Sequence, residues 1–127
     1  MVSADAGQRF RRVCRLHETD EFSSVFAFRR ALRGRFYTLH YRPNEAGGAR
    51  LGVTVAKKLV KRANVRNLVK RIAREVFRRQ RASLPACDVV ARLHAPIAGA
   101  RRADLDHDMR QLMSRLSSIP GNTREIA

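Results

Sequence analysis

The segment 57–81 gathers cationic side chains at a spacing that suits the binding of phosphate groups. It holds eleven lysines and arginines and one acid, Glu75, in a chain whose 127 residues carry a net charge of +16. Basic residues recur there at every fourth position, which places them along one side of a helix: Arg66, Lys70, Arg74 and Arg78. Like charges at this spacing repel each other unless an anionic partner neutralises them. Because arginine binds phosphate bidentately, the segment predicts a polyanionic partner.

Structured RNA fits this basic segment better than two other anionic partners. A membrane surface would take up the apolar side of the helix, which the small core needs. A DNA-recognition helix usually follows another helix across a tight turn, whereas a predicted strand precedes this segment. Shape and phosphate contacts dominate the recognition of structured RNA, and a rigid basic face provides contacts of this kind. We therefore expect an RNA partner, and neither DNA nor a membrane.

The residues that carry hydrolytic chemistry in enzymes are not grouped along the chain. The four histidines are scattered, and we interpret them as surface or packing residues: His17, His40, His94 and His107. Three acids, Asp104, Asp106 and Asp108, stand close together, but acids at this spacing are typical of the start of a helix. Without paired carboxylates or a nucleophile beside a base, we expect no catalytic residue in this chain.

Cysteine usage and hydropathy narrow the class of protein further. Cys14 and Cys87 have neither the spacing of zinc ligands nor that of a disulfide framework, so we expect reduced thiols and no metal held by protein side chains. No apolar stretch approaches the ~20 residues of a membrane helix, and the N-terminus lacks the apolar core of a secretory signal. We expect one cytoplasmic domain, since 44% hydrophobic residues suffice for a core.

The elements that must position the basic segment alternate between helix and strand. Apolar periodicity predicts helices over 20–30, from Asn64 to before Pro85, and from Asp104 to Leu116. Strands are predicted over 36–42, 51–56 and 88–94. The short loop between the first two strands favours an antiparallel pair. The order is α-β-β-α-β-α, an α+β fold in one small domain over residues 15–117, with flexible tails over 1–14 and 118–127.

The predicted strands each present two different faces. Tyr37, Leu39 and Tyr41 share one face of the first strand, and either face is open to a ligand at this point. In the second strand Gly52 and its neighbours form a low face of small side chains. Such a face permits either a close approach by a ligand backbone or tight packing of a helix.

The stretch VAKKLVKRANVRNLVKRIARE (55–75) resembles the most characteristic part of the bacterial ribonuclease P protein component. That family has a strand ending in Lys-Lys, a short basic link, and a helix that opens with Arg-Asn-Arg. The spacing of Leu16, Phe22 and Phe26 is similar to the family's first helix. The resemblance covers roughly residues 15–117. It departs at Leu68, where the family usually has arginine, and at Leu93 and His94, where a lysine is common.

The resemblance implies a mixed sheet of three to four strands in which the basic helix makes a left-handed crossover between parallel strands. It also implies a subunit that binds a catalytic RNA and the 5′ leader of precursor tRNA. The RNA would carry out cleavage with Mg²⁺, one protein would bind each RNA, and the protein would supply no catalytic side chain. The implied RNA-binding residues are Lys57, Lys58, Lys61, Arg62, Arg66, Asn67, Lys70, Arg71 and Arg74. The implied leader-binding residues are Phe22, Phe26, Tyr37 and Arg92.

Two other functions remain open from the residues alone. A different basic RNA-binding module, such as a small ribosomal protein, would share the charge and the size but would need no groove for a single strand. A free-standing nuclease would need clustered acids or histidines for metal ions. The i, i+4 spacing of Phe22 and Phe26 is also typical of core residues, so packing is an alternative to leader contact.

Overall fold

The structure is a computed structural model that describes residues 19–44 and 47–119. Its elements are α1 (Thr19–Phe28), β1 (Arg30–Arg33), β2 (Tyr37–Pro43), β3 (Arg50–Thr54), α2 (Ala63–Gln80), the 3-10 helix η3 (Arg81–Ser83), β4 (Cys87–Leu93) and α3 (Arg102–Ser117). The predicted tail over 1–14 lies outside the described residues, as does most of 118–127. Within the described part, Ile119 packs against the core.

The four strands form one mixed sheet in the order β1-β2-β4-β3. Strand β4 pairs antiparallel with β2 and parallel with β3, so it lies between the two strands that precede it. The prediction that the strands over 36–42 and 51–56 are antiparallel neighbours was therefore wrong. Loop length favoured that pairing, but the apolar residues of β4 fit the central position, where both faces of the sheet are covered.

The edge strand β1, which follows α1, was not predicted from the sequence. Residues up to Arg30 were assigned to the first helix, which ends at Phe28. Arg29 has a φ of 63°, the left-handed conformation that commonly ends a helix, although glycine is the usual residue there. This reversal turns the chain into β1, which pairs antiparallel with β2 from Arg30 opposite Tyr41 to Arg33 opposite Thr38.

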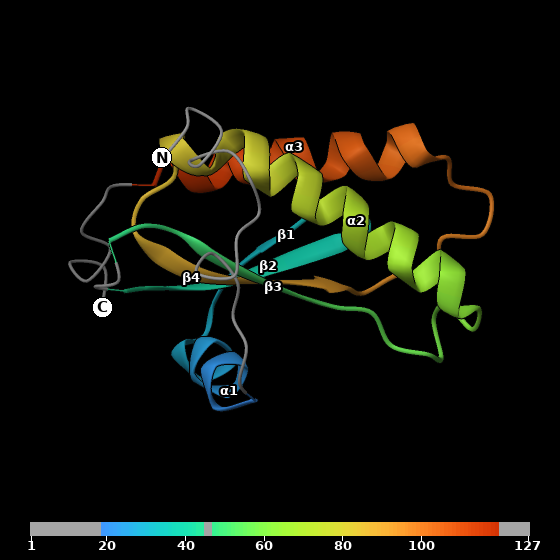
Figure 1. Cartoon of the computed structure of the whole chain (residues 1–127), viewed down its shortest axis with the longest axis horizontal. Coiled ribbons are helices and arrows are strands. Elements are labelled where there is room, and N and C mark those ends of the chain that lie inside the picture. The colour runs from blue at the N-terminus through green and yellow to red at the C-terminus, as the bar shows by residue number, and fades with distance from the viewer. Residues whose placement is uncertain (1–18, 45–46, 120–127) are drawn as a thin grey trace, which may run out of the picture.

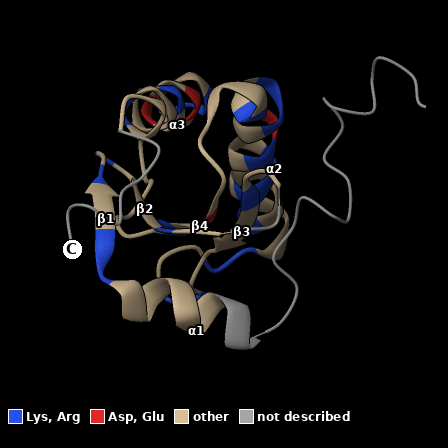
Figure 2. Ribbon diagram, turned by 90° about the vertical axis from the view of Figure 1, so that its left-hand side faces the viewer, with Lys and Arg blue, Asp and Glu red and all other residues tan. Residues whose placement is uncertain are grey.

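The connection from β3 through α2 to β4 has the left-handed sense that the resemblance implied. In Figure 1 both strands run from left to right, with α2 above the sheet. Figure 2 looks along the strands, and the chain passes from β3 on the right, up through α2 and down to β4 on its left. The path therefore turns anticlockwise as it recedes, opposite to the usual hand of such crossovers.

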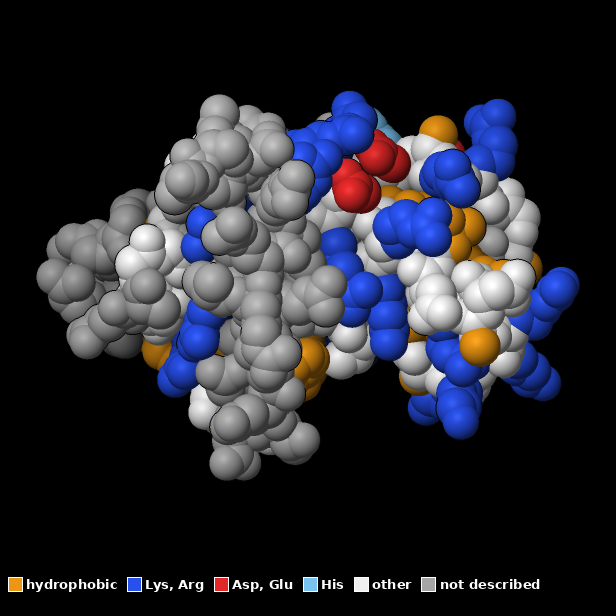
Figure 3. Space-filling view, viewed as in Figure 1, with side chains coloured by type: hydrophobic (Ala, Val, Ile, Leu, Met, Phe, Trp, Pro, Cys, Tyr) orange, Lys and Arg blue, Asp and Glu red, His pale blue; other side chains and the backbone are white. Residues whose placement is uncertain are grey.

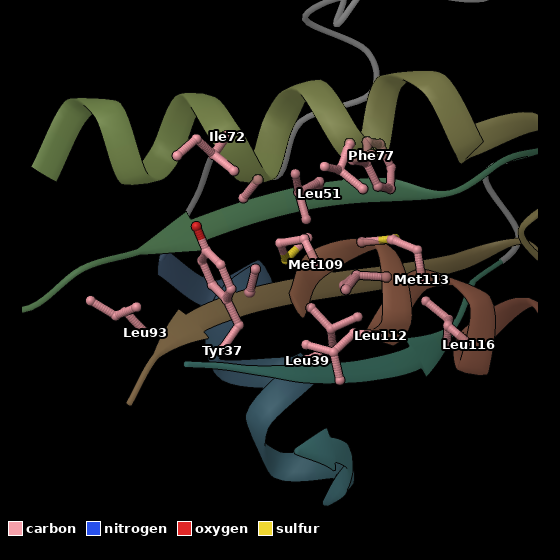
Figure 4. Close-up of a cluster of buried hydrophobic side chains, with 14 of the residues drawn as sticks. Tyr37, Leu39, Leu51, Ile72, Phe77, Leu93, Met109, Leu112, Met113 and Leu116 are labelled. Atoms are coloured by element: carbon pink, nitrogen blue, oxygen red, sulfur yellow. The ribbon is translucent and has the colours of Figure 1, made fainter. Parts of the chain in front are cut away.

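Helices cover both faces of the sheet, and the larger core lies on the side of α2 and α3 (Figures 1 and 2). Alternate residues of the strands point into this core, as Tyr37, Leu39 and Leu93 do (Figure 4). The predicted apolar stripe of α3 is buried there as well, from Leu105 to Leu116. On the other face α1 covers a smaller cluster in which Val25 packs against Val90.

Two buried carboxylates join distant parts of the chain. Asp108 of α3 accepts hydrogen bonds from the backbone N–H groups of Arg35, Phe36 and Tyr37 at 2.8–2.9 Å, which fixes the β1–β2 turn to the helix. Asp88 of β4 is fully buried and accepts from Arg50 and Asn44. Burial raises the pKa of Asp88, but the hydrogen bonds from Arg50 and Asn44 outweigh it and hold the pKa below its usual value.

The starts of the two long helices differ from the predictions. Helix α2 begins at Ala63 after Arg62, with no side-chain cap, so Asn64 is not the capping residue. Helix α3 begins at Arg102, and Asp104 lies in its first turn, where its carboxylate accepts from the backbone N–H of Arg101 at 2.9 Å. The acid stabilises the start of the helix in either position, because both bring it to free N–H groups.

Candidate RNA interface

The first part of the candidate interface is the exposed side of α2 and the segment 57–62 that leads into it, here called the lead-in. Its predicted residues Lys57, Lys58, Lys61 and Arg62 are exposed, as are Asn67 and Arg71 of the helix. Lys70 and Arg74 are half-buried. Figure 3 shows basic side chains gathered where the lead-in and the first turns of α2 lie. The apolar side of the helix faces the sheet.

The row of cations at every fourth position is not turned inward. At its far end Arg78 pairs with Glu75 at 2.9 Å, on the same helix. The other acids whose side chains the structure describes are Asp88 of β4 and Asp104, Asp106 and Asp108 of α3. The dense positive charge of the lead-in and the first turns of α2 is therefore available to a polyanion.

Arg66 has an additional role that its spacing did not indicate. Its Nη1 donates to the carbonyl oxygens of Val60 at 3.0 Å and of Lys61 at 2.8 Å. These bonds connect the first turn of α2 to the lead-in, whose apolar residue Val60 is buried in the core. The guanidinium thus fixes the path of the backbone that carries Lys57 to Arg62.

Leu68, where the family usually has arginine, is half-buried and packs against the core. Its side chain adds to the apolar side of α2 rather than to the basic side. Leucine in place of arginine at position 68 therefore removes one charge, but the exposed row of cations at every fourth position stays complete.

The second part of the candidate interface is the face of the sheet beside α1. Phe22 lies directly over Gly52, so close that a Cβ on Gly52 would overlap its ring. Phe26 meets the ring of His40 edge to face, with centroids 4.7 Å apart. Both phenylalanines are half-buried. The tight-packing interpretation of Gly52 is thus confirmed, and part of each phenylalanine remains open to solvent.

A polar row crosses the sheet next to these aromatic rings. Register places Arg33, Thr38, Arg92 and Thr54 side by side on the four strands, on the same face as α1. Arg92 Nε donates to His40 Nε2 at 3.2 Å. One end of the row opens into a pocket of about 480 Å³ lined by Thr54, Ala56, Lys58, Arg92 and His94 among others. The predicted residue Arg92 therefore lies in a groove that also holds a lysine of the lead-in.

Two histidines of this face were interpreted only as surface or packing residues. His94 Nδ1 is hydrogen-bonded to the hydroxyl of Thr38 at 2.7 Å. Burial and the cation of Arg92 lower the pKa of His40, and burial together with Arg33 and Arg92 lowers the pKa of His94. Both shifts favour the neutral form of the ring. The period-two pattern gives the face of each strand on which its histidine lies. Only the pairing of β2 with β4 brings the two histidines onto the same face of the sheet.

Tyr37, predicted to bind the leader, lies on the opposite side of the sheet. It is fully buried in the core, and its hydroxyl donates to the carbonyl oxygen of Val69 in α2 at 2.9 Å. Burial and the nearby carboxylates of Asp108 and Asp106 raise the pKa of Tyr37. This position excludes Tyr37 from a cleft beside α1, and the same holds for Tyr41, which shares its face. The alternation of side chains along the strand did not show which of its faces would be exposed. In the structure, the crossover helix α2 covers the face that carries the tyrosines.

The described residues show no grouping of acids, histidines and cysteines that would hold a metal ion. Cys87 is a free, buried thiol, and burial raises its pKa to about 12. Cys14 and His17 lie outside the described residues. In the part of the chain that the structure describes, no helix has the length and apolar character needed to cross a membrane.

Comparisons with known proteins agree with this arrangement. The sequence model of the Ribonuclease P family matches residues 10–117. The ribonuclease P protein component of Azoarcus sp. is 69% identical over 113 residues, which are 89% of this chain and 94% of that protein. The one from Aromatoleum aromaticum is 60% identical, over 85% of this chain and 91% of that protein.

Solved structures show the same fold. The RNase P protein of Thermotoga maritima has a TM-score of 0.70 at 26% identity, covering 84% of this chain and 98% of that one. The RNase P protein of Staphylococcus aureus, at 21% identity, has a TM-score of 0.73 and covers 80% and 94%. Membership of this family implies a role in a tRNA-processing ribonucleoprotein and association with the ribonuclease P RNA. The family match over most of the chain and the high identity to these relatives lead to one conclusion: this chain belongs to the ribonuclease P protein family.

Proposed function

We propose that this chain binds the catalytic RNA of ribonuclease P through the lead-in and the exposed side of α2. The observation that carries the proposal is the basic surface from Lys57 to Arg74, which is held in place by Arg66 and is directed away from the core. Phosphates neutralise such a surface, and the release of their counterions makes the association depend steeply on salt. A rigid helix that presents its cations at fixed spacing suits the regular backbone of structured RNA.

The face of the sheet beside α1, together with the pocket next to it, is proposed to hold the 5′ leader of precursor tRNA and is called the leader groove below. Phe22 and Phe26 offer partly open rings on which bases stack with little regard to sequence. Arg92 and Lys58 supply cations for the leader backbone at the nearby pocket. A groove with aromatic rings and cations serves leaders of different sequence, as a general tRNA-processing subunit requires. Tyr37 is not part of this proposed set.

We assign the cleavage of the leader to the RNA subunit. Mg²⁺ ions held by the RNA would activate the water that cleaves the leader, while the side chains of this chain raise the affinity for substrate. One protein would act on each RNA, in the cytoplasm. The alternative of a small ribosomal protein has no support in the comparisons, which place the chain in the ribonuclease P family.

Reconstitution tests the proposal. The cognate catalytic RNA is assayed at low Mg²⁺ with and without this chain, on precursor tRNA and on mature tRNA. We expect the chain to bind the RNA and to raise cleavage and precursor affinity, and to show no cleavage by itself. An RNA that binds and cleaves equally well with and without the chain would contradict it.

Variants separate the two surfaces. Phe22→Ala is expected to weaken binding of the leader-bearing precursor, by about 1–3 kcal/mol for a lost base stack, without affecting mature tRNA. Phe28→Ala is the matched control, since Phe28 lies on the same helix and is exposed. Equal losses for precursor and mature tRNA would instead assign Phe22 to packing.

A further inference from the structure

A second group of arginines surrounds the outer edge of β1, where only Arg33 adjoins the polar row of the candidate interface. Arg29 precedes the strand, Arg33 ends it, Arg35 lies in the turn to β2 and Arg115 comes from the last turn of α3; all four are exposed. Arg115 Nη1 donates to the carbonyl oxygen of Arg33 at 3.1 Å, which joins the helix to the strand edge. These four residues are called the β1-edge surface below.

The positive charge of the β1-edge surface is not balanced by carboxylates within the described residues. The acids whose side chains the structure describes have partners other than the guanidinium groups of this surface. Glu75 pairs with Arg78, Asp106 pairs with Arg110, and Asp88 pairs with Arg42 and Arg50. Asp104 accepts from the backbone N–H of Arg101, and Asp108 accepts from three backbone N–H groups.

The β1-edge surface lies across the sheet from the basic helix. The strand order places β1 at one edge and β3 at the other, with α2 packed over β3. Figure 2 shows Lys and Arg on β1 at the left and along α2 at the right, with the sheet and α3 between them. The two basic surfaces therefore lie at opposite edges of the sheet.

Edge strands often carry charges simply to prevent pairing with other chains. Such repulsion needs no fixed orientation of the side chains. Here the guanidinium of Arg35 lies over the ring of Phe36 at 4.9 Å, and that of Arg115 is bonded to a backbone carbonyl. Both groups are thus held in place before any partner binds. Fixed, exposed guanidinium groups are suited to bind the phosphates of a structured RNA.

We propose that the β1-edge surface binds a second segment of structured RNA while α2 binds the first. The proposal rests on the proposed function, because the RNA in question is the catalytic RNA that α2 engages. It assigns the protein a bridging role: the sheet separates the two basic surfaces and fixes the distance between the two RNA segments that they hold.

The test uses the full chain and the cognate catalytic RNA. The variant Arg33→Gln/Arg35→Gln removes two charges of the β1-edge surface and keeps the backbone groups that bond Arg115 and Asp108. The control Arg101→Gln/Arg102→Gln removes two exposed charges at the other end of α3, about 20 Å along the helix from Arg115. The second comparison is Lys70→Gln/Arg71→Gln on α2. Thermal unfolding checks that all variants are folded.

Two measurements are made on each protein: the slope of log Kd against log salt concentration, and hydroxyl-radical protection of the RNA. We expect the wild type to protect two separate tracts. The β1-edge variant should lose one tract and about two units of slope, and the α2 variant should lose the other tract. The control should keep both tracts.

The outcomes separate this proposal from the proposed function. If the β1-edge variant matches the control in slope and protection, the proposal is overturned, while the loss of a tract in the α2 variant would still support the RNA contact of α2. The proposal is also overturned if the β1-edge variant loses affinity only for leader-bearing precursor. Arg33 would then belong to the leader groove. A wild-type chain that does not bind the catalytic RNA overturns both proposals.

Discussion

The guanidinium of Arg66 is bonded to the carbonyl oxygen of Lys61, so the first turn of α2 and the lead-in form one unit. A residue that is expected to bind phosphate from its spacing thus also organises its neighbours. The affinity for RNA therefore depends on the shape of the lead-in as well as on its charge.

Substitutions at Arg66 should distinguish position from charge. Arg66→Lys keeps the charge but not the two carbonyl bonds, and we expect weaker RNA binding with an almost unchanged salt slope. Lys70→Gln, in contrast, should reduce the slope by about one unit per lost phosphate contact. Amide exchange in the lead-in should become faster in Arg66→Lys and not in Lys70→Gln. Unaltered exchange and affinity in Arg66→Lys would show that the carbonyl bonds do not order the lead-in.

The contact of Phe22 with Gly52 makes that glycine sensitive to substitution. The methyl group of Gly52→Ala would overlap the ring of Phe22, so α1 must shift. We expect a loss of about 1–3 kcal/mol in the free energy of unfolding. We also expect weaker binding of leader-bearing precursor, because Phe22 moves with the helix. Urea unfolding and precursor titration measure the two effects. The double variant Phe22→Ala/Gly52→Ala should recover part of the stability, because the ring that overlaps the methyl group is gone. Additive losses in the double variant would argue against the contact.

Stability should fall below neutral pH because of the two histidines beside α1. Burial, Arg92 and, for His94, Arg33 lower the pKa of His40 and His94, so the unfolded chain binds protons that the folded chain does not. At pH values above the ordinary histidine pKa, the two histidines leave the free energy of unfolding unchanged. They lower it progressively as the pH falls below about 6.5.

Urea unfolding between pH 5 and pH 8 measures this dependence. His40→Gln/His94→Gln should flatten it, whereas His107→Gln, at an exposed position on α3, should not. Identical pH profiles for the wild type and the double variant would exclude these histidines as its source.

Asp108 should be one of the residues on which the fold depends most. Asp108→Ala leaves the N–H groups of Arg35, Phe36 and Tyr37 without their acceptor, and we expect a loss on the order of 3 kcal/mol in unfolding free energy. Asp106→Ala is the matched control, because that acid is half-exposed and pairs with Arg110 on the surface; it should cost under 1 kcal/mol. Comparable losses in the two variants would show that the turn has another support.

The periodic elements could be predicted from the sequence because their apolar residues repeat clearly. Helix α2, the stripe of α3 and the strands 37–43 and 87–93 were found within a few residues. The short strand β1 was not found, because the reversal at Arg29 lacks the usual glycine. The strand order was also wrong in part, since the pairing of β4 between β2 and β3 depends on contacts distant in sequence.

The candidate site was predictable where exposure follows from helical spacing, and less so on the sheet. The side of α2 that carries Lys70 and Arg71 was correctly expected to face away from the core. Tyr37 was misplaced because alternation gives two faces and does not say which one a helix will cover. The bonds from Arg66 to the lead-in carry no signal in spacing at all, since they need the particular turn at Val60 and Lys61.

The central place of β4 has a consequence for synthesis on the ribosome. Strand β3 has its hydrogen-bonding partner in β4, which follows more than thirty residues later. Until residues 87–93 leave the exit tunnel, β1 and β2 can pair as a hairpin, but the apolar edge of β3 stays without a neighbour. The nascent chain should therefore depend on its highly charged middle segment to stay in solution, and it should acquire its tertiary structure only near the end of translation.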